Sequence, residues 1–81
     1  PLWLEIGFGK GEHMAAQAAA HPHIGLIGAE PFVDGVVGAL MAVRDGQLGN
    51  VRIHHGDALD VLERLAPASI DRLFLLHPDP W

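Results

Sequence analysis

The chain has 81 residues, with ten acidic against five basic side chains, a net charge of −5 and no cysteine. That length fits one small domain, and the lack of cysteine excludes a disulfide framework and a thiolate zinc site. Apolar residues make up 49% of the chain, which is typical of a globular protein. No apolar run approaches the ~20 residues of a membrane span. The few basic residues are scattered, so this segment by itself is not expected to grip a phosphate backbone. We therefore expect part of a cytoplasmic enzyme.

The two ends of the chain favour an excerpt of a larger domain. It starts at Pro1 rather than at a methionine, and it stops at Trp81, directly after a strand-like run. We expect residues 1–81 to be one partial domain, truncated on its carboxyl-terminal side and inactive on its own.

Apolar runs alternate along the chain with patterns of helical period, which is typical of βαβ units on a parallel sheet. In chain order the expected elements are strand Leu2–Ile6, helix Glu12–Ala20, strand Ile24–Ala29, helix Val33–Leu48, strand Val51–His55, helix Ala58–Leu65 and strand Ile70–Leu76. Right-handed crossovers would place helices on both faces of the sheet, giving a doubly wound α/β fold. In such a fold the ligand site lies at the carboxyl ends of the strands.

Three apolar patterns predict how the later elements pack. The second helix, closed by Gly49-Asn50, has a stripe of aliphatic side chains at Val33, Val36, Val37, Leu40 and Val43. The third helix has leucines on one side at Leu59, Leu62 and Leu65. We expect the aliphatic stripe of the second helix and the leucine side of the third helix to face the sheet. The last strand is continuously apolar, which predicts a strand covered on both faces.

A glycine-rich turn, Gly7-Phe8-Gly9-Lys10-Gly11, follows the first strand. Glycines here let the backbone pass close to a ligand, although a plain tight turn is the alternative. Glu12 stands where a dinucleotide fingerprint has its third glycine, and Glu5 lies two residues before the first glycine. A carboxylate at that point would repel a pyrophosphate and would favour an ammonium group. The pattern therefore fits a sulfonium cofactor, S-adenosylmethionine, better than NAD.

Acidic residues also follow the second and third strands. Glu30 ends Gly28-Ala29-Glu30, where a carboxylate can accept both ribose hydroxyls of an adenosine. Asp57, in His55-Gly56-Asp57-Ala58, could accept a hydrogen bond from the exocyclic amine of an adenine. The alternative for each acid is a helix N-cap. Because the acids share one sheet edge with the glycine turn, we favour cofactor binding.

Asp79 lies just beyond the fourth strand, in His77-Pro78-Asp79-Pro80-Trp81, where the prolines on both sides hold it rigidly. The alternative is a proline-stiffened turn.

Two histidine pairs, His21/His23 and His54/His55, suggest metal ligands at first sight. A structural metal needs about four converging ligands, and neighbouring strand residues such as His54 and His55 point to opposite faces. We expect no metal site.

Together these motifs resemble the tRNA (guanine-N7)-methyltransferases, a family of class I S-adenosylmethionine-dependent enzymes. The resemblance spans nearly the whole chain, and Pro78-Asp79-Pro80-Trp81 is its most specific part. It implies a Rossmann-like fold, here with about four strands and three helices, and methyl transfer to N7 of a guanine in the tRNA variable loop. It assigns the active-site acid to Asp79 and cofactor binding to Glu5, Gly7, Gly9, Glu30, Asp57 and Ala58. In the family a basic run follows the tryptophan, so tRNA is expected to bind mainly through residues beyond Trp81.

Two other interpretations stay open, namely another class I methyltransferase and an NAD(P)-dependent oxidoreductase with a generic fingerprint. Methyltransferases that act on amino groups use an Asn/Asp-Pro-Pro-aromatic element. Here a single proline, Pro80, separates Asp79 from Trp81, which disfavours that class.

Overall fold

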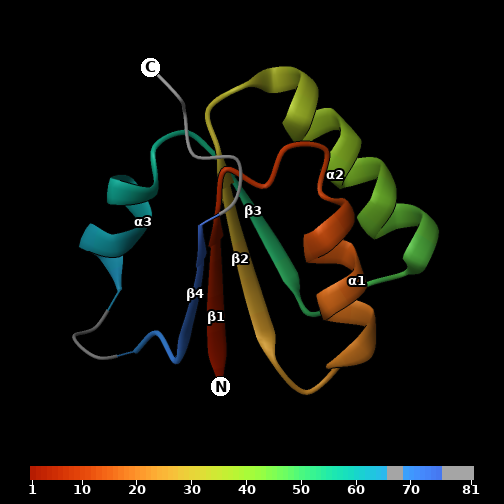
Figure 1. Ribbon diagram of the computed structural model, residues 1–81, viewed down its shortest axis with the longest axis horizontal. Coiled ribbons are helices and arrows are strands. Elements are labelled where there is room, and N and C mark those ends of the chain that lie inside the picture. The colour runs from red at the N-terminus through yellow and green to blue at the C-terminus, as the bar shows by residue number, and fades with distance from the viewer. Residues whose placement is uncertain (66–68, 76–81) are drawn as a thin grey trace.

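The computed structural model describes residues 1–65 and 69–75. It consists of a four-stranded parallel sheet with helices on both faces (Figure 1). In chain order the elements are β1 (Leu2–Ile6), α1 (Glu12–Ala20), β2 (Gly25–Glu30), α2 (Val33–Gly46), β3 (Val51–His55), α3 (Ala58–Arg64) and β4 (Arg72–Leu75). The strand order is β3-β2-β1-β4, so the chain steps outward from β1 to β3 and then returns to the other side of β1. This is the predicted doubly wound arrangement. None of the described helices is long and apolar enough to cross a membrane.

Two apolar clusters lie on the two faces of the sheet. On one face Met14 of α1 and Val36 of α2 pack with Trp3 of β1. On the other face Val61 of α3 packs with Leu4 of β1. Trp3 and Leu4 are neighbours in sequence, and successive side chains of a strand point to opposite faces. The helices α1 and α2 therefore cover one face of the sheet, and α3 covers part of the other (Figure 1).

The buried side of α2 differs from the predicted stripe. Val36 and Ala39 are buried and Val43 is partly buried, but Val33, Val37 and Leu40 are about half exposed. The reason is that α2 turns its smallest residues toward the glycine turn after β1. A Cβ at Gly35 would collide with the carbonyl oxygen of Gly9. This close approach selects the small-residue side of α2 as the inner one.

The prediction that α3 turns its leucine side toward the sheet is also wrong in part. Leu59 and Leu62 are 60% and 43% exposed, whereas Ala58 and Val61 are buried and Leu65 is partly buried. With only seven residues, α3 approaches the sheet through its small first residue and Val61 rather than through its leucines.

Strand β4 is shorter and more exposed than its apolar run predicts. It begins at Arg72 rather than at Ile70, and Leu73 and Leu75 are 56% and 62% exposed. The α3 cluster contains strand residues from β1 and β2, Leu4 and Ala29, and therefore leaves the same face of β4 open. The expectation that both faces of this strand are covered is wrong for the described residues.

Turn geometry explains two further differences in the element bounds. Strand β2 starts one residue late because the Ile24 N–H donates to the His21 carbonyl in a turn (3.0 Å). Helix α2 stops before Leu48 because Gln47 adopts the left-handed conformation (φ 52°) and the Leu48 N–H turns back to the Val43 carbonyl (3.0 Å).

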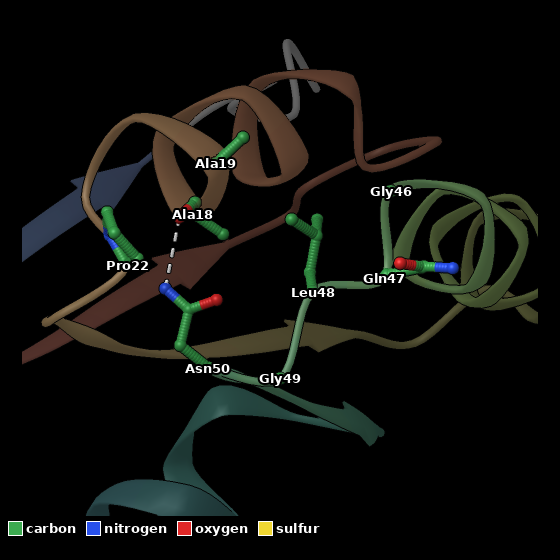
Figure 2. Close-up of a pocket in the computed structure, with 8 residues that line it drawn as sticks. All are labelled: Ala18, Ala19, Pro22, Gly46, Gln47, Leu48, Gly49 and Asn50. Atoms are coloured by element: carbon green, nitrogen blue, oxygen red, sulfur yellow. Dashed lines mark hydrogen bonds between the residues drawn. The ribbon is translucent and has the colours of Figure 1, made fainter.

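Asn50, directly before β3, ties the end of α1 to the sheet (Figure 2). Its Nδ2 lies 3.1, 3.1 and 2.9 Å from the carbonyl oxygens of Ala18, His21 and Ile24. The last carbonyls of a helix have no partner within the helix, so a side-chain donor is valuable there. An open pocket of about 390 Å³ lies between the end of α1 and residues 46–50, at the amino ends of the strands.

Replacing Asn50 by alanine should lower the free energy of unfolding by about 1–3 kcal/mol, because buried acceptors lose their donor. Urea unfolding of the full-length protein measures this change. The matched variant Asn50→Asp should be less stable still, because a carboxylate would face three carbonyl oxygens. Wild-type stability in both variants would show that Asn50 does not tie these segments together.

Candidate cofactor site

The acids predicted for the cofactor site lie at one edge of the sheet, where β1, β2 and β3 end (Figure 1, upper edge). Glu5 is the penultimate residue of β1 and Glu30 is the last of β2. Past the strand ends, the Gly7 N–H donates to the Ala29 carbonyl and the Gly56 N–H to the Glu30 carbonyl, both at 3.0 Å. The shared edge is thus confirmed, while the ligand contacts of these residues stay predictions.

The turn between β1 and α1 has a left-handed backbone at all its glycines. The φ angles are 68° at Gly7, 61° at Gly9 and 83° at Gly11. Residues with a Cβ rarely adopt such angles. Phe8, only 2% exposed, fixes this turn in the cluster under α1 and α2. The turn therefore presents bare backbone at Gly7 and Gly9, as a cofactor cradle requires.

Helix α2 supports the glycine turn from behind with small residues. A Cβ at Gly38 would lie 3.2 Å from the Lys10 carbonyl oxygen, and a Cβ at Gly11 would lie 2.8 Å from the Ala39 Cβ. With the Gly35–Gly9 approach, this makes a tight seam between the turn and α2. Our sequence reasoning missed this seam, although Gly35, Gly38 and Ala39 share one helix face by their spacing.

The carboxylate of Glu30 connects the glycine turn with the start of α2. Oε1 accepts from the Gly9 N–H at 3.0 Å and Oε2 from the Phe32 N–H at 3.1 Å, and Glu30 is 5% exposed. Phe32, not Glu30, is the N-cap residue of α2, so the simple helix-cap alternative is wrong. A carboxylate has about four acceptor sites, so each oxygen can accept one further hydrogen bond.

Glu5, in β1 just before the glycine turn, is fully buried. Its Oε1 is 2.6 Å from Nδ1 of His13, the second residue of α1. In the tautomer that carries its proton on Nδ1, His13 donates to this oxygen. His13 is a site residue that our sequence reasoning missed, because we examined histidines only as adjacent pairs.

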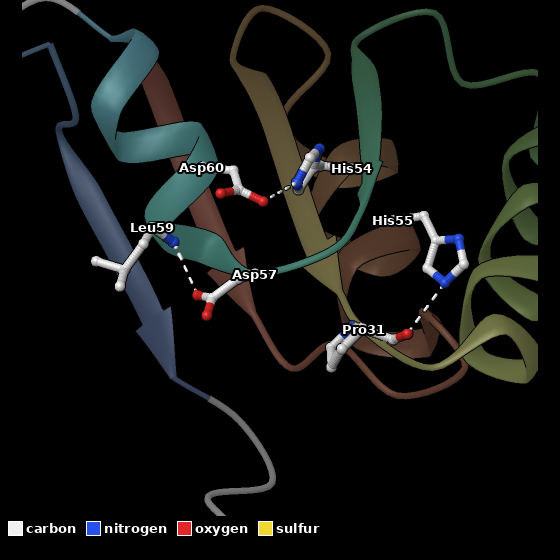
Figure 3. A network of polar contacts seen from close by, with 6 residues as sticks. All are labelled: Pro31, His54, His55, Asp57, Leu59 and Asp60. Carbon is white, nitrogen blue, oxygen red and sulfur yellow. Dashed lines mark hydrogen bonds and ion pairs between the residues drawn. The ribbon is translucent and has the colours of Figure 1, made fainter.

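Asp57 is the N-cap residue of α3, and its Oδ1 accepts from the Leu59 N–H at 2.9 Å (Figure 3). The alternative interpretation of Asp57 as a helix N-cap is therefore confirmed. It does not exclude a ligand, because the carboxylate has acceptor sites left. The side chain of Ala58 is buried in the α3 cluster, so only its main chain could contact a cofactor.

The two histidines of β3 point to opposite faces, as predicted (Figure 3). His54 Nε2 lies 3.4 Å from Oδ2 of Asp60 on α3, and His55 Nε2 donates to the Pro31 carbonyl at 3.0 Å. Within residues 1–65 and 69–75, no group of three or more His, Asp or Glu could hold a metal ion.

Asp79 and its neighbours from His77 to Trp81 lie outside the described residues. The role of Asp79 therefore stays a prediction from the sequence. Strand β4, which leads to it, pairs with β1, and Phe74 is the register partner of Glu5.

The chain is similar to curated tRNA (guanine-N(7)-)-methyltransferases along its whole length. It is 59% identical over 81 residues to the protein of Zymomonas mobilis and 62% identical over 80 residues to that of Caulobacter sp.. These matches cover 100% and 99% of the chain but 35% of each relative, so the chain spans about a third of their length.

A solved structure supports the fold. PKMT2 from Rickettsia typhi, in complex with AdoHcy, superposes with a TM-score of 0.75 at 19% identity, over 91% of this chain and 14% of that one. This confirms the Rossmann-like class I methyltransferase fold. A family model described as "Putative methyltransferase" matches residues 1–81 in full. The chain therefore belongs to this methyltransferase family.

Proposed function

We propose that this chain forms the S-adenosylmethionine-binding part of an enzyme that methylates N7 of a guanine in the tRNA variable loop. The observation that supports this most is the left-handed glycine turn, whose Gly9 N–H is held by the buried Glu30 carboxylate. The names of the curated relatives add the substrate.

The residues at the sheet edge fit the parts of S-adenosylmethionine. The buried Glu5 carboxylate suits its ammonium group, and bare backbone at Gly7 and Gly9 leaves room for its methionine moiety. Glu30 has acceptor sites left for two ribose hydroxyls, and Asp57, beside the main chain of Ala58, can accept from the adenine amine. When bound, this cofactor supplies a methyl group activated by the sulfonium.

Methyl transfer to N7 requires correct positioning of the guanine and does not require a general base. N7 of guanine carries an in-plane lone pair and no proton, so the protein has to align it with the methyl group and sulfur. The guanine becomes cationic as the bond forms, so a nearby carboxylate stabilises the transition state. We assign this role to Asp79, which can also accept from the N1–H or amino group of the guanine.

We assign binding of the tRNA mainly to residues that follow Trp81 in the longer relatives. The chain has a net charge of −5 and only five basic residues, so it does not supply the clustered charge that a phosphate backbone requires. Such an enzyme would work in the cytoplasm, with its tRNA substrate.

Calorimetry with S-adenosylhomocysteine and NAD separates this proposal from the oxidoreductase alternative. We expect the full-length protein to bind S-adenosylhomocysteine and not NAD. The reason is that Glu5, directly before the glycine turn, would repel the negatively charged pyrophosphate of NAD. Binding of NAD alone would overturn the proposal.

Replacing Glu30 by alanine should weaken binding of S-adenosylhomocysteine by about 1.5–3 kcal/mol, the value of hydrogen bonds to a charged group. The variant also loses the acceptor of Gly9, which loosens the turn. Asp45→Ala, at an exposed acid near the far end of α2, is the matched control and should bind as wild type does. Unchanged affinity in a folded Glu30→Ala protein would leave Glu30 as a purely structural residue.

A further inference from the structure

We propose that His13 is a positioning residue for the cofactor, whose Nδ1–H orients the Glu5 carboxylate to receive an ammonium group. This inference rests on the proposed function, because it concerns the acid that we assign to the methionine moiety. His13 itself is not expected to touch the cofactor.

The contact between the two side chains is short and buried on the Glu5 side. Nδ1 of His13 lies 2.6 Å from Oε1 of Glu5, whose side chain is 0% exposed while that of His13 is 38% exposed. Hydrogen bonds to an ionised group are shorter and about twice as strong as neutral ones. The imidazole thus supplies a donor to a carboxylate that water reaches poorly.

The ring of His13 is held in place from the neighbouring strand. It packs edge-on against Phe74 of β4, with centroids 5.0 Å apart and planes at 67°. Phe74 is the register partner of Glu5, and it also packs edge-on against Trp3 at 5.6 Å. Because this packing restricts the imidazole, its N–H is aimed at Glu5 before any ligand binds. Preorganised supporting contacts of this kind hold binding groups in their productive geometry.

The chemistry of an imidazole suits a site that has to attract a cation. Each N–H that donates to a buried carboxylate stabilises it and helps to fix its orientation. A lysine or arginine in this place would also pair with Glu5, but its positive charge would compete with the ammonium. An imidazole can donate through Nδ1 without carrying the permanent charge of a lysine or arginine. Position 13 therefore combines a donor with the absence of a fixed charge.

Two ligands that differ by the amino-acid moiety test this role in the full-length protein. S-adenosylhomocysteine carries the ammonium, whereas 5′-methylthioadenosine lacks the whole amino-acid part. We expect His13→Ala to raise the Kd of S-adenosylhomocysteine about 10-fold, in line with the loss of one charge-assisted hydrogen bond. The Kd of 5′-methylthioadenosine should stay unchanged.

A conservative variant and a control complete the calorimetry. Asparagine places its Nδ2 where histidine has Nδ1, so His13→Asn should restore most of the affinity for S-adenosylhomocysteine. His23→Ala changes an exposed histidine outside α1 and should bind both ligands as wild type does. Circular dichroism checks that each variant is folded.

Three results would overturn the inference in distinguishable ways. Equal loss of both ligands in His13→Ala would make His13 a structural residue only. Unchanged affinity in His13→Ala, beside weakened binding in Glu5→Gln, would refute the role of His13 and leave the proposed function standing. A wild-type protein that binds neither ligand would overturn the proposed function as well.

Discussion

Replacing Asp79 by asparagine in the full-length protein should lower the single-turnover rate of methyl transfer about 100-fold or more, while cofactor affinity changes little. Asparagine keeps the shape of the side chain and removes its charge. Loss of one preorganised electrostatic group at a reaction centre typically costs a factor of this size. Rapid-quench measurements with saturating cofactor and tRNA give the rate, and calorimetry gives the affinity.

The pH dependence of the Asp79→Asn variant adds a second criterion. N7 has no proton to remove, so raising the pH should not restore the rate. A rate that recovered steeply with pH would contradict the proton-free mechanism. A variant that lost the cofactor but kept its rate at saturation would make Asp79 a binding residue. Asp45→Asn, at the exposed end of α2, serves as the control and should leave rate and affinity unchanged.

Replacing Gly9 by valine should abolish detectable binding of S-adenosylhomocysteine. Gly9 has a φ of 61°, its N–H is bound by Glu30, and its carbonyl oxygen lies against Gly35 of α2. A β-branched side chain opposes the left-handed conformation and fills the space above the backbone. Neighbouring contacts on both sides leave the turn little freedom to adapt. Calorimetry with the ligand at high concentration measures the loss.

Gly49→Val is a matched control for the glycine experiment. A Cβ at Gly49 would meet no atom within 4 Å, so valine fits there and binding should be normal. If Gly9→Val folded and bound S-adenosylhomocysteine as Gly49→Val does, the turn after β1 would not be the cofactor cradle.

Local patterns were sufficient to predict the elements that the site depends on. The bounds of β1, α1 and β3 match the prediction because strong stop signals flank them, such as Gly7 after β1 and Pro22 after α1. Parallel strands bring their carboxyl ends to one edge, so the positions of Glu5, Glu30 and Asp57 at that edge also followed from the sequence.

Tertiary packing decided what the sequence pattern could not predict. The inner side of α2 is set by the contact of Gly35 with Gly9, two residues that are far apart in sequence, and not by the aliphatic stripe. Likewise, the pairing of His13 with Glu5 depends on how α1 crosses β1 and on Phe74 of β4. Periodicity describes one element at a time and carries no information on such contacts.

The position of the transferred methyl group tests the central claim most directly. The full-length protein would be incubated with unmodified tRNA and S-adenosylmethionine, and the tRNA then treated with borohydride and aniline, which cleave the chain at N7-methylguanine. We predict cleavage at a guanine of the variable loop, and no detectable cleavage there with Asp79→Asn at the same short reaction time. Methyl transfer to another atom or base, or no transfer by a protein that binds S-adenosylhomocysteine, would contradict the account.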